Sequence, residues 1–128
     1  MSRRWLVYAF FLTPFFAAGA QHADSTASCL HPATASDAKD CADSTLRAQN
    51  AALERTYRRI LASADSSRRP LLRTAQAAWE SYRKAYCRYL ASEFRGGSME
   101  GLEEVSCLAS EARRRTKQLE RDSKNEHH

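Results

Sequence analysis

The sequence predicts an all-α protein, a small antiparallel bundle of three helices that two disulfides staple together after a cleaved signal peptide. Three observations support this fold class. Apolar residues recur at helical spacing after residue 36, and no alternating strand pattern competes with them. Gly96 and Gly97 interrupt that periodicity and mark a reversal of the chain. Four cysteines in a chain of 128 residues are typical of a small exported domain with disulfides.

The first twenty residues have the pattern of a secretory signal peptide. Arg3 and Arg4 form a basic start, an apolar run follows over residues 5–17, and Ala18–Ala20 supplies small residues for cleavage. The apolar run is too short to span a membrane. We therefore expect a periplasmic or secreted protein, cleaved after Ala20, with cleavage after Ala23 as the alternative.

All four cysteines lie in the 108 residues that remain when these 20 are removed from the 128. They are Cys29, Cys41, Cys87 and Cys107. Three pairings are possible, and the spacing favours Cys29 with Cys41 and Cys87 with Cys107. Because Cys29 lies well downstream of the apolar run, we expect no lipid anchor. No Cys-x-x-Cys occurs, so neither a redox-active pair nor a zinc ribbon is indicated.

The charge of the mature chain is only mildly basic. The 20 basic residues less Arg3 and Arg4, set against 15 acidic residues, leave a net charge of +3. This value does not indicate a nucleic-acid partner, which an exported protein would rarely meet.

The first predicted helix begins near Ser36 and ends near Ala64. Residues 21–36 precede it as an extended lead-in, with Ser36 as the expected N-cap. The apolar residues of this helix are Leu46, Leu53, Tyr57, Ile60 and Leu61. The helical domain is expected to cover residues 37–121.

The second predicted helix runs from about Pro70, which suits a first helical turn, to about Phe94. Gly96 and Gly97 end it by permitting a left-handed cap. Its expected apolar face comprises Leu71, Leu72, Ala75, Trp79, Tyr82, Tyr86 and Leu90.

The third predicted helix runs from about Met99 to Arg121, with Ser98 as its cap. Acidic residues gather at its start and basic residues at its end, as the helix dipole favours: Glu100, Glu103 and Glu104, then Arg113, Arg114, Arg115 and Lys117. Its thinner apolar stripe comprises Met99, Leu102, Val105, Ala109, Ala112 and Leu119. Residues 122–128 are expected to form a disordered tail.

The sequence gives no positive sign of catalysis. Histidine is the usual general base, yet His22, His31, His127 and His128 all lie outside the predicted helices. The terminal histidine pair is a weak ligand set for a metal. We therefore expect no enzyme activity, no cofactor and no metal site.

Gln76, Trp79, Arg83 and Cys87 stand three or four residues apart and share one stripe of the second helix. Trp79 is either a core residue or an interface anchor. Arg83 is suited to stacking on Trp79 or to pairing with a carboxylate of the third helix. Gln76 faces the core and must find a partner on a neighbouring helix or on the turn backbone. Structural roles are favoured for Trp79 and Arg83.

Two surface features allow a functional interpretation beside a structural one. The turn Gly96–Ser98 is either a simple turn or the rigid contact surface of a small inhibitor. The arginines of the helix faces either promote solubility or form a basic surface for anionic envelope polymers: Arg58, Arg59, Arg68, Arg69 and Arg113 to Arg115.

The assembled pattern resembles the LprI-type N-terminal domain family, small exported helical proteins of bacteria. The resemblance extends from Cys29 to Leu119. It is carried by the four cysteines together with Leu53, Tyr57, Gln76, Trp79, Arg83, Gly96, Gly97, Ser98, Arg115 and Leu119. The chain departs from the family pattern at Asn50, Glu54, Lys84 and Ala112. The family takes its name from a mycobacterial lipoprotein described as a lysozyme inhibitor.

The resemblance implies a protein that binds lysozyme and occludes it without chemistry of its own. The candidate residues for binding this partner are Gly97, Ser98, Glu100, Glu103 and Glu104. The alternative is an envelope-associated adaptor that binds an anionic polymer or an acidic protein partner through the arginine faces. The sequence predicts no oligomeric state.

Overall fold

A computed structural model describes residues 29–125 of the chain. The predicted signal peptide and its cleavage site lie outside the described residues, as do lead-in residues 21–28 and residues 126–128. The described part forms three long helices, α2 (Ala35–Ser63), α3 (Arg68–Ala91) and α4 (Ser98–Asn125), and one short 3₁₀ helix, η1 (Ser92–Phe94). It contains no strand. The predicted all-α fold class is confirmed.

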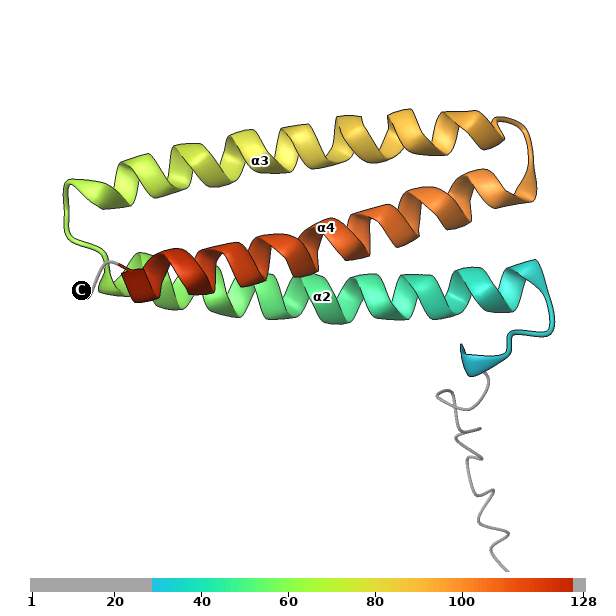
Figure 1. The fold of residues 1–128 in the computed structure, drawn as a ribbon, viewed down its shortest axis with the longest axis horizontal. Helices are drawn as coiled ribbons and strands as arrows, with labels where there is room; N and C mark the ends of the chain where they lie inside the picture. Colours follow the sequence, from blue (N-terminus) through green and yellow to red (C-terminus); the bar gives the residue numbers. More distant parts are fainter. Residues whose placement is uncertain (1–28, 126–128) are drawn as a thin grey trace, which may run out of the picture.

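Helix α4 lies between the other two helices, and α3 runs antiparallel to both (Figure 1). Helices α2 and α4 approach closely along much of their length, whereas α2 and α3 come close at few points. Small side chains explain the close pair, because Ala109, Ala112 and Thr56 are all buried. Larger side chains of α3, chiefly Trp79, separate α3 from α4.

The apolar core lies where the three helices meet. Its buried residues are Leu53, Ile60, Ala112 and Leu119, with Tyr57, Leu72 and Trp79 packed against them. Only a few large apolar side chains are therefore fully enclosed. With a core this modest, cross-links and polar contacts must contribute much of the stability.

Helix α2 begins one residue before the predicted cap, and its N-cap is Thr34 rather than Ser36. The Thr34 hydroxyl accepts a hydrogen bond from the Asp37 amide at 3.1 Å. The Asp37 carboxylate accepts in return from the Thr34 amide at 3.0 Å. This reciprocal capping box satisfies two backbone donors, whereas Ser36 is already inside the helix.

The helix ends near the glycines agree with the prediction in part. Gly96 has φ of +79°, the left-handed conformation expected of it. The α-helical part of α3, however, ends at Ala91, and η1 completes the approach to the turn. Helix α4 continues to Asn125, so residues 122–125 are helical and the predicted disordered tail is wrong there. Ser123 is half-buried, and its hydroxyl donates to the Glu120 carbonyl.

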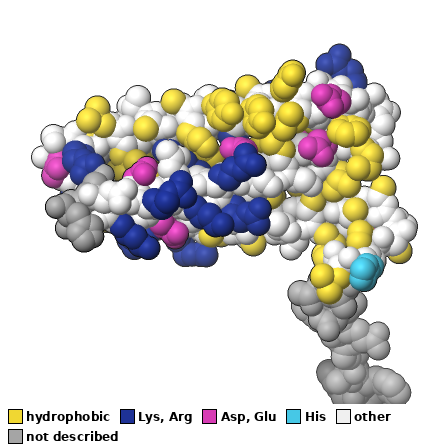
Figure 2. Space-filling view, viewed as in Figure 1, with side chains coloured by type: hydrophobic (Ala, Val, Ile, Leu, Met, Phe, Trp, Pro, Cys, Tyr) yellow, Lys and Arg dark blue, Asp and Glu magenta, His cyan; other side chains and the backbone are white. Residues whose placement is uncertain are grey.

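The predicted apolar face of α3 is wrong at three of its seven positions. Leu71 and Tyr82 are 70% and 56% exposed, and Ala75 is exposed as well. Gln76 and Cys87 are buried, as the spacing of their stripe predicts. Because Cys87 must face Cys107 on α4, the disulfide fixes the rotation of α3 and leaves part of its apolar surface outside (Figure 2). Met99, predicted to face the core from α4, is also exposed.

Both disulfides have the pairing that the sequence spacing favours. Cys29 pairs with Cys41 and Cys87 with Cys107, each with Cα atoms 5.5 Å apart. Cys87 and Cys107 are buried, and their bond joins α3 to α4 across the hairpin. Cys29 is exposed, and its bond ties the lead-in to α2.

We predict that the hairpin disulfide is the more important of the two for stability. Replacing its cysteines, Cys87→Ala with Cys107→Ala, should lower the free energy of unfolding by about 3 kcal/mol, because the unfolded chain gains loop entropy. The midpoint of thermal unfolding, followed by circular dichroism, should fall by on the order of 10–20 °C. The matched control, Cys29→Ala with Cys41→Ala, should have a smaller effect. A hairpin variant as stable as the control would contradict this prediction.

The turn between α2 and α3 is organised by the carboxylate of Asp65. Its Oδ1 accepts hydrogen bonds from the Ser67 hydroxyl at 2.6 Å, the Ser67 amide at 2.9 Å and the Arg68 amide at 3.0 Å. The bond from the Ser67 hydroxyl contributes most to holding the pKa of Asp65 below its ordinary value of 3.8, followed by the bond from the Arg68 amide. The charged carboxylate thus stabilises the folded turn.

Because the folded-state pKa of Asp65 is depressed, its contribution to stability is present above the unfolded-state pKa. That contribution is lost as the pH falls through the folded-state pKa. We therefore expect Asp65→Asn to lower the unfolding midpoint near neutral pH, with the difference from the parent protein shrinking below pH 3.8. Melting curves recorded across this range test the prediction. A difference independent of pH would show that the charge has no role.

Candidate functional site

Arg83 on α3 joins all three helices through its guanidinium group. Its Nε and Nη2 atoms donate to the Leu108 carbonyl of α4 at 3.1 and 2.6 Å. Nη2 also donates to the Asn50 side-chain oxygen of α2 at 2.9 Å. The sequence suggests that Arg83 either stacks on Trp79 or pairs with a carboxylate of α4. In the structure, its hydrogen bonds go to a carbonyl and an amide, and not to a carboxylate of α4.

Gln76 lies one helical turn before Trp79 and is buried. Its side-chain oxygen accepts a hydrogen bond from Arg115 Nε of α4 at 3.1 Å. A second nitrogen of Arg115, Nη1, donates to the Gln118 side-chain oxygen at 2.9 Å. Of the two partners expected for Gln76, a neighbouring helix or the turn backbone, the structure shows the neighbouring helix.

The ring of Trp79 lies close to both arginines of this network. The guanidinium carbon of Arg83 is 5.3 Å from the ring centroid, and that of Arg115 is 5.7 Å from it. Both distances are within the range of a cation–π contact. Since Trp79 also packs against the apolar core, it connects that core with the polar network. This geometry agrees with a structural role for Trp79.

Burial affects both guanidinium groups in the same direction. Desolvation lowers the pKa of Arg83, and the charges of Glu80 and Glu111 oppose that shift. Desolvation likewise lowers the pKa of Arg115, against the opposing charge of Asp122. Arginine remains protonated despite such shifts, so the two cations must be satisfied by hydrogen bonds and by the Trp79 ring. We infer that the network holds the bundle together.

The turn between α3 and α4 lies at one end of the bundle (Figure 1). The Gly97 amide donates to the Phe94 carbonyl at 3.0 Å, and a Cβ atom at Gly97 would lie only 3.2 Å from that oxygen. The Gly96 amide donates to the Glu100 carboxylate at 3.0 Å. Gly97 and Ser98 are exposed. The turn is thus closed by its own hydrogen bonds and open to solvent.

The three candidate carboxylates near the turn have different surroundings. Glu100 is engaged by the Gly96 amide, and Glu104 Oε1 lies 3.7 Å from Arg88 Nε. Glu103 has no hydrogen bond or ion pair within the part of the chain that the structure describes. All three are half-buried. The structure brings these residues to one end of the bundle, next to the exposed side chains of Phe94 and Met99.

Arg95 is exposed in the turn itself, but most of the basic residues gather elsewhere. Figure 2 shows lysine and arginine side chains over the middle and the C-terminal half of α4 and along α2. Arg113 and Arg114 are exposed there, whereas Arg115 is buried in the network. The predicted run of three surface arginines therefore divides between the surface and the core.

Sequence reasoning missed the Asn50 contact and the Leu108 carbonyl. Both partners of Arg83 come from other helices, 33 and 25 residues away. A backbone carbonyl carries no sequence signal. Asn50 had been noted only as a departure from the family pattern, although an amide on a helix face is a usable signal.

We predict that Arg83 cannot be replaced by lysine without loss of stability. A lysine ammonium lacks the planar fork that reaches two acceptors while stacking on Trp79. Arg83→Lys should therefore lower the free energy of unfolding by about 2 kcal/mol, measured by chemical denaturation. The control Arg88→Lys, at an exposed position on the same helix, should change it by less than about 0.5 kcal/mol. Equal effects of the two substitutions would refute the bridging role.

The chain is similar to one relative and to one protein family. Uncharacterized protein R02472 of Rhizobium meliloti (strain 1021) is 35% identical over 104 residues, which cover 71% of this chain and 75% of the relative. No solved structure matches the chain. None of the helices that the structure describes is long and apolar enough to cross a membrane. The family described as lysozyme inhibitor LprI matches residues 25–119, from ahead of the first disulfide to the last buried leucine. The chain belongs to this family.

Proposed function

We propose that the protein is an exported lysozyme inhibitor that binds the enzyme and blocks its cleft without chemistry of its own. Membership in a family described as lysozyme inhibitors is the observation that carries this proposal. The two disulfides support a location outside the cytoplasm, because such bonds persist in oxidising compartments.

The α3–α4 end of the bundle is the surface that we assign to the enzyme. It presents Gly97 and Ser98 at an exposed turn, flanked by Phe94 and Met99, which are 42% and 43% exposed. Exposed aromatic and methionine side chains are enriched at protein interfaces. A narrow turn on a cross-linked hairpin has a shape suited to a concave site, such as the cleft of a glycosidase.

Charge complementarity must come from a local patch. Lysozymes are commonly basic, and a partner of net charge +3 gains no overall electrostatic attraction to them. Glu100, Glu103 and Glu104 supply negative charge beside the turn. Since Glu100 and Glu104 already have partners within the bundle, Glu103 is the carboxylate most available to a basic enzyme.

The second candidate is an envelope-associated adaptor that binds an anionic polymer or an acidic protein. The observation that favours it is the gathering of basic side chains over α4 and α2 (Figure 2). Binding of this kind depends on exposed charges and weakens steeply with salt. The two functions therefore differ in their salt dependence and in the surface that they use.

We expect the oxidised mature protein to bind a basic lysozyme in a one-to-one complex and to inhibit lysis. Calorimetric titration at two salt concentrations, with lytic activity measured in parallel, tests this expectation. Binding should persist at the higher salt concentration, because the apolar side chains at the turn contribute to it. The absence of binding at both concentrations would overturn the proposal, and binding to an anionic polymer that salt abolishes would favour the adaptor.

A charge reversal then tests the assigned surface. Glu103→Lys should raise the dissociation constant for lysozyme about tenfold, since it places like charge against a basic enzyme. Its unfolding midpoint should stay close to that of the parent protein. The control Glu120→Lys makes the same charge change near the other end of α4 and should leave affinity unchanged. Equal losses in both variants would place the contact elsewhere.

A further inference from the structure

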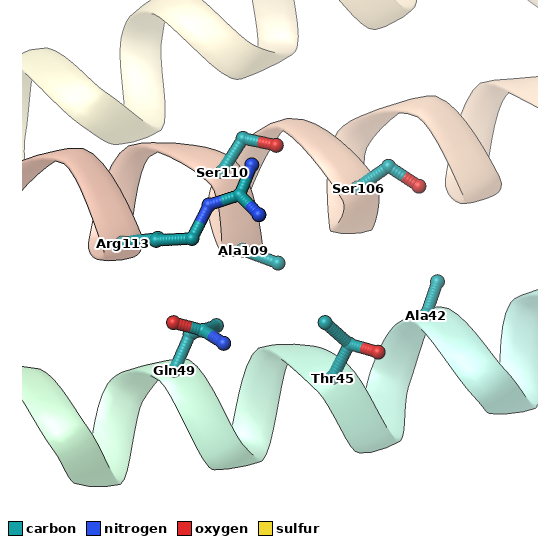
Figure 3. Close-up of a pocket in the computed structure, with 7 residues that line it drawn as sticks. All are labelled: Ala42, Thr45, Gln49, Ser106, Ala109, Ser110 and Arg113. Carbon is teal, nitrogen blue, oxygen red and sulfur yellow. The ribbon is translucent and has the colours of Figure 1, made fainter. Parts of the chain in front are cut away.

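A hollow between α2 and α4 is lined mainly by polar side chains from the two helices (Figure 3). Thr45 and Gln49 line it from α2, and Ser106, Ser110 and Arg113 line it from α4. Its volume is about 220 Å³. None of these residues is among those that we assign to the inhibitor surface.

The hollow follows from helical spacing and from two small residues. Ser106, Ser110 and Arg113 are four and three residues apart and so share one stripe of α4. Thr45 and Gln49 form the facing stripe on α2, again four residues apart. Between the stripes, Ala42 and Ala109 fill little space. The closest helix pair of the bundle thus leaves a polar depression along its outer groove.

The lining side chains offer donors without an acidic partner. Among the lining residues there is no aspartate or glutamate. Within the described residues, the side chains of Gln49, Ser106, Ser110 and Arg113 make no hydrogen bond or ion pair. Two other groups already have partners. Next to the hollow, Arg114 pairs with Glu111 at 2.8 Å, and within it the Thr45 hydroxyl donates to the Cys41 carbonyl at 2.9 Å.

We propose that this hollow binds a single oxyanionic group, a carboxylate or a phosphate, carried by a small polar molecule. Arg113 pairs with the charge, and the two serine hydroxyls and the Gln49 amide donate hydrogen bonds to its oxygens. An oxyanion is the ligand that satisfies every donor at once. The volume lies below the roughly 300–1,000 Å³ of sites for larger ligands, so the hollow accommodates a head group.

The proposal does not depend on the lysozyme-binding assignment. Ser106 is three residues from Glu103, but Arg113, which carries the charge of the site, is distant from the turn. Arg113 lies fifteen residues along α4 from Ser98, which corresponds to about 22 Å at the rise of an α-helix. Lys117 follows one turn later on the same helix and adds positive charge. A bound anion at this place would therefore leave the α3–α4 turn accessible.

Titration of the oxidised, isotope-labelled protein tests the site. Inorganic phosphate and lactate serve as the phosphate and carboxylate probes, with glycerol as the neutral control, all at constant ionic strength. We expect saturable shifts of the backbone amide resonances of residues 42–49 and 106–113 with phosphate, lactate or both. The stronger of the two probes identifies the class of oxyanion. Shifts that do not saturate, or that glycerol reproduces, would overturn the proposal.

Two substitutions and a matched control locate the binding. Arg113→Gln should weaken the affinity for the stronger probe about tenfold, the worth of one charged hydrogen-bonding partner. Ser110→Ala should weaken it to a smaller extent. Arg121→Gln makes the same charge change on the same helix, two turns beyond the hollow, and should leave affinity unchanged. Equal weakening by Arg113→Gln and Arg121→Gln would show diffuse attraction to a basic surface and would refute a defined site.

Discussion

The guanidinium of Arg83 is the contact on which the arrangement of the helices depends, because it reaches acceptors on both other helices from the middle of α3. Helices α2 and α3 come close at few points and are joined chiefly through α4. The Arg83–Asn50 bond is a direct polar tie between them. Around it, Trp79 and the Gln76–Arg115 pair occupy the space that a larger bundle would fill with apolar side chains.

A core built in this way is specific but contributes modestly to stability. Each buried guanidinium loses hydration, and its hydrogen bonds offset that loss with little left over. The hydrogen bonds are directional, however, and they can all form at only one rotation and one register of α3. The Cys87–Cys107 disulfide acts in the same sense, since it constrains the unfolded chain and fixes the same stripe against α4. Covalent and polar contacts together replace the apolar burial that a chain of this size lacks.

The fold could be predicted from the sequence, but the exposure of several apolar residues of α3 could not. Helical periodicity, the Gly96–Gly97 break and the cysteine spacing are local signals, and they locate three helices and the hairpin correctly. Hydrophobicity wrongly predicts Tyr82 inside, whereas the spacing of Gln76 with Trp79 and Cys87 correctly predicts that Gln76 faces the core. A polar side chain becomes suitable for a core only when distant partners meet it, and the sequence does not place those partners. The polar hollow was missed for the same reason, since Ser106 and Ser110 gain meaning only opposite Gln49.

The two ends of α4 carry charges of opposite sign. Acidic residues at its start and basic residues towards its end suit the helix dipole, and in the bundle they separate an acidic turn from a basic distal half. In the complex that we propose with a basic enzyme, the net charge of +3 expected after cleavage would give no overall attraction. This separation of charge would favour approach through the turn over approach through the arginine-rich surface. Because the disulfide and Arg83 hold the hairpin in place before any encounter, little conformational freedom at the turn remains to be lost on binding. A small protein with a limited core can therefore keep this turn ordered, which is what the proposed contact surface requires.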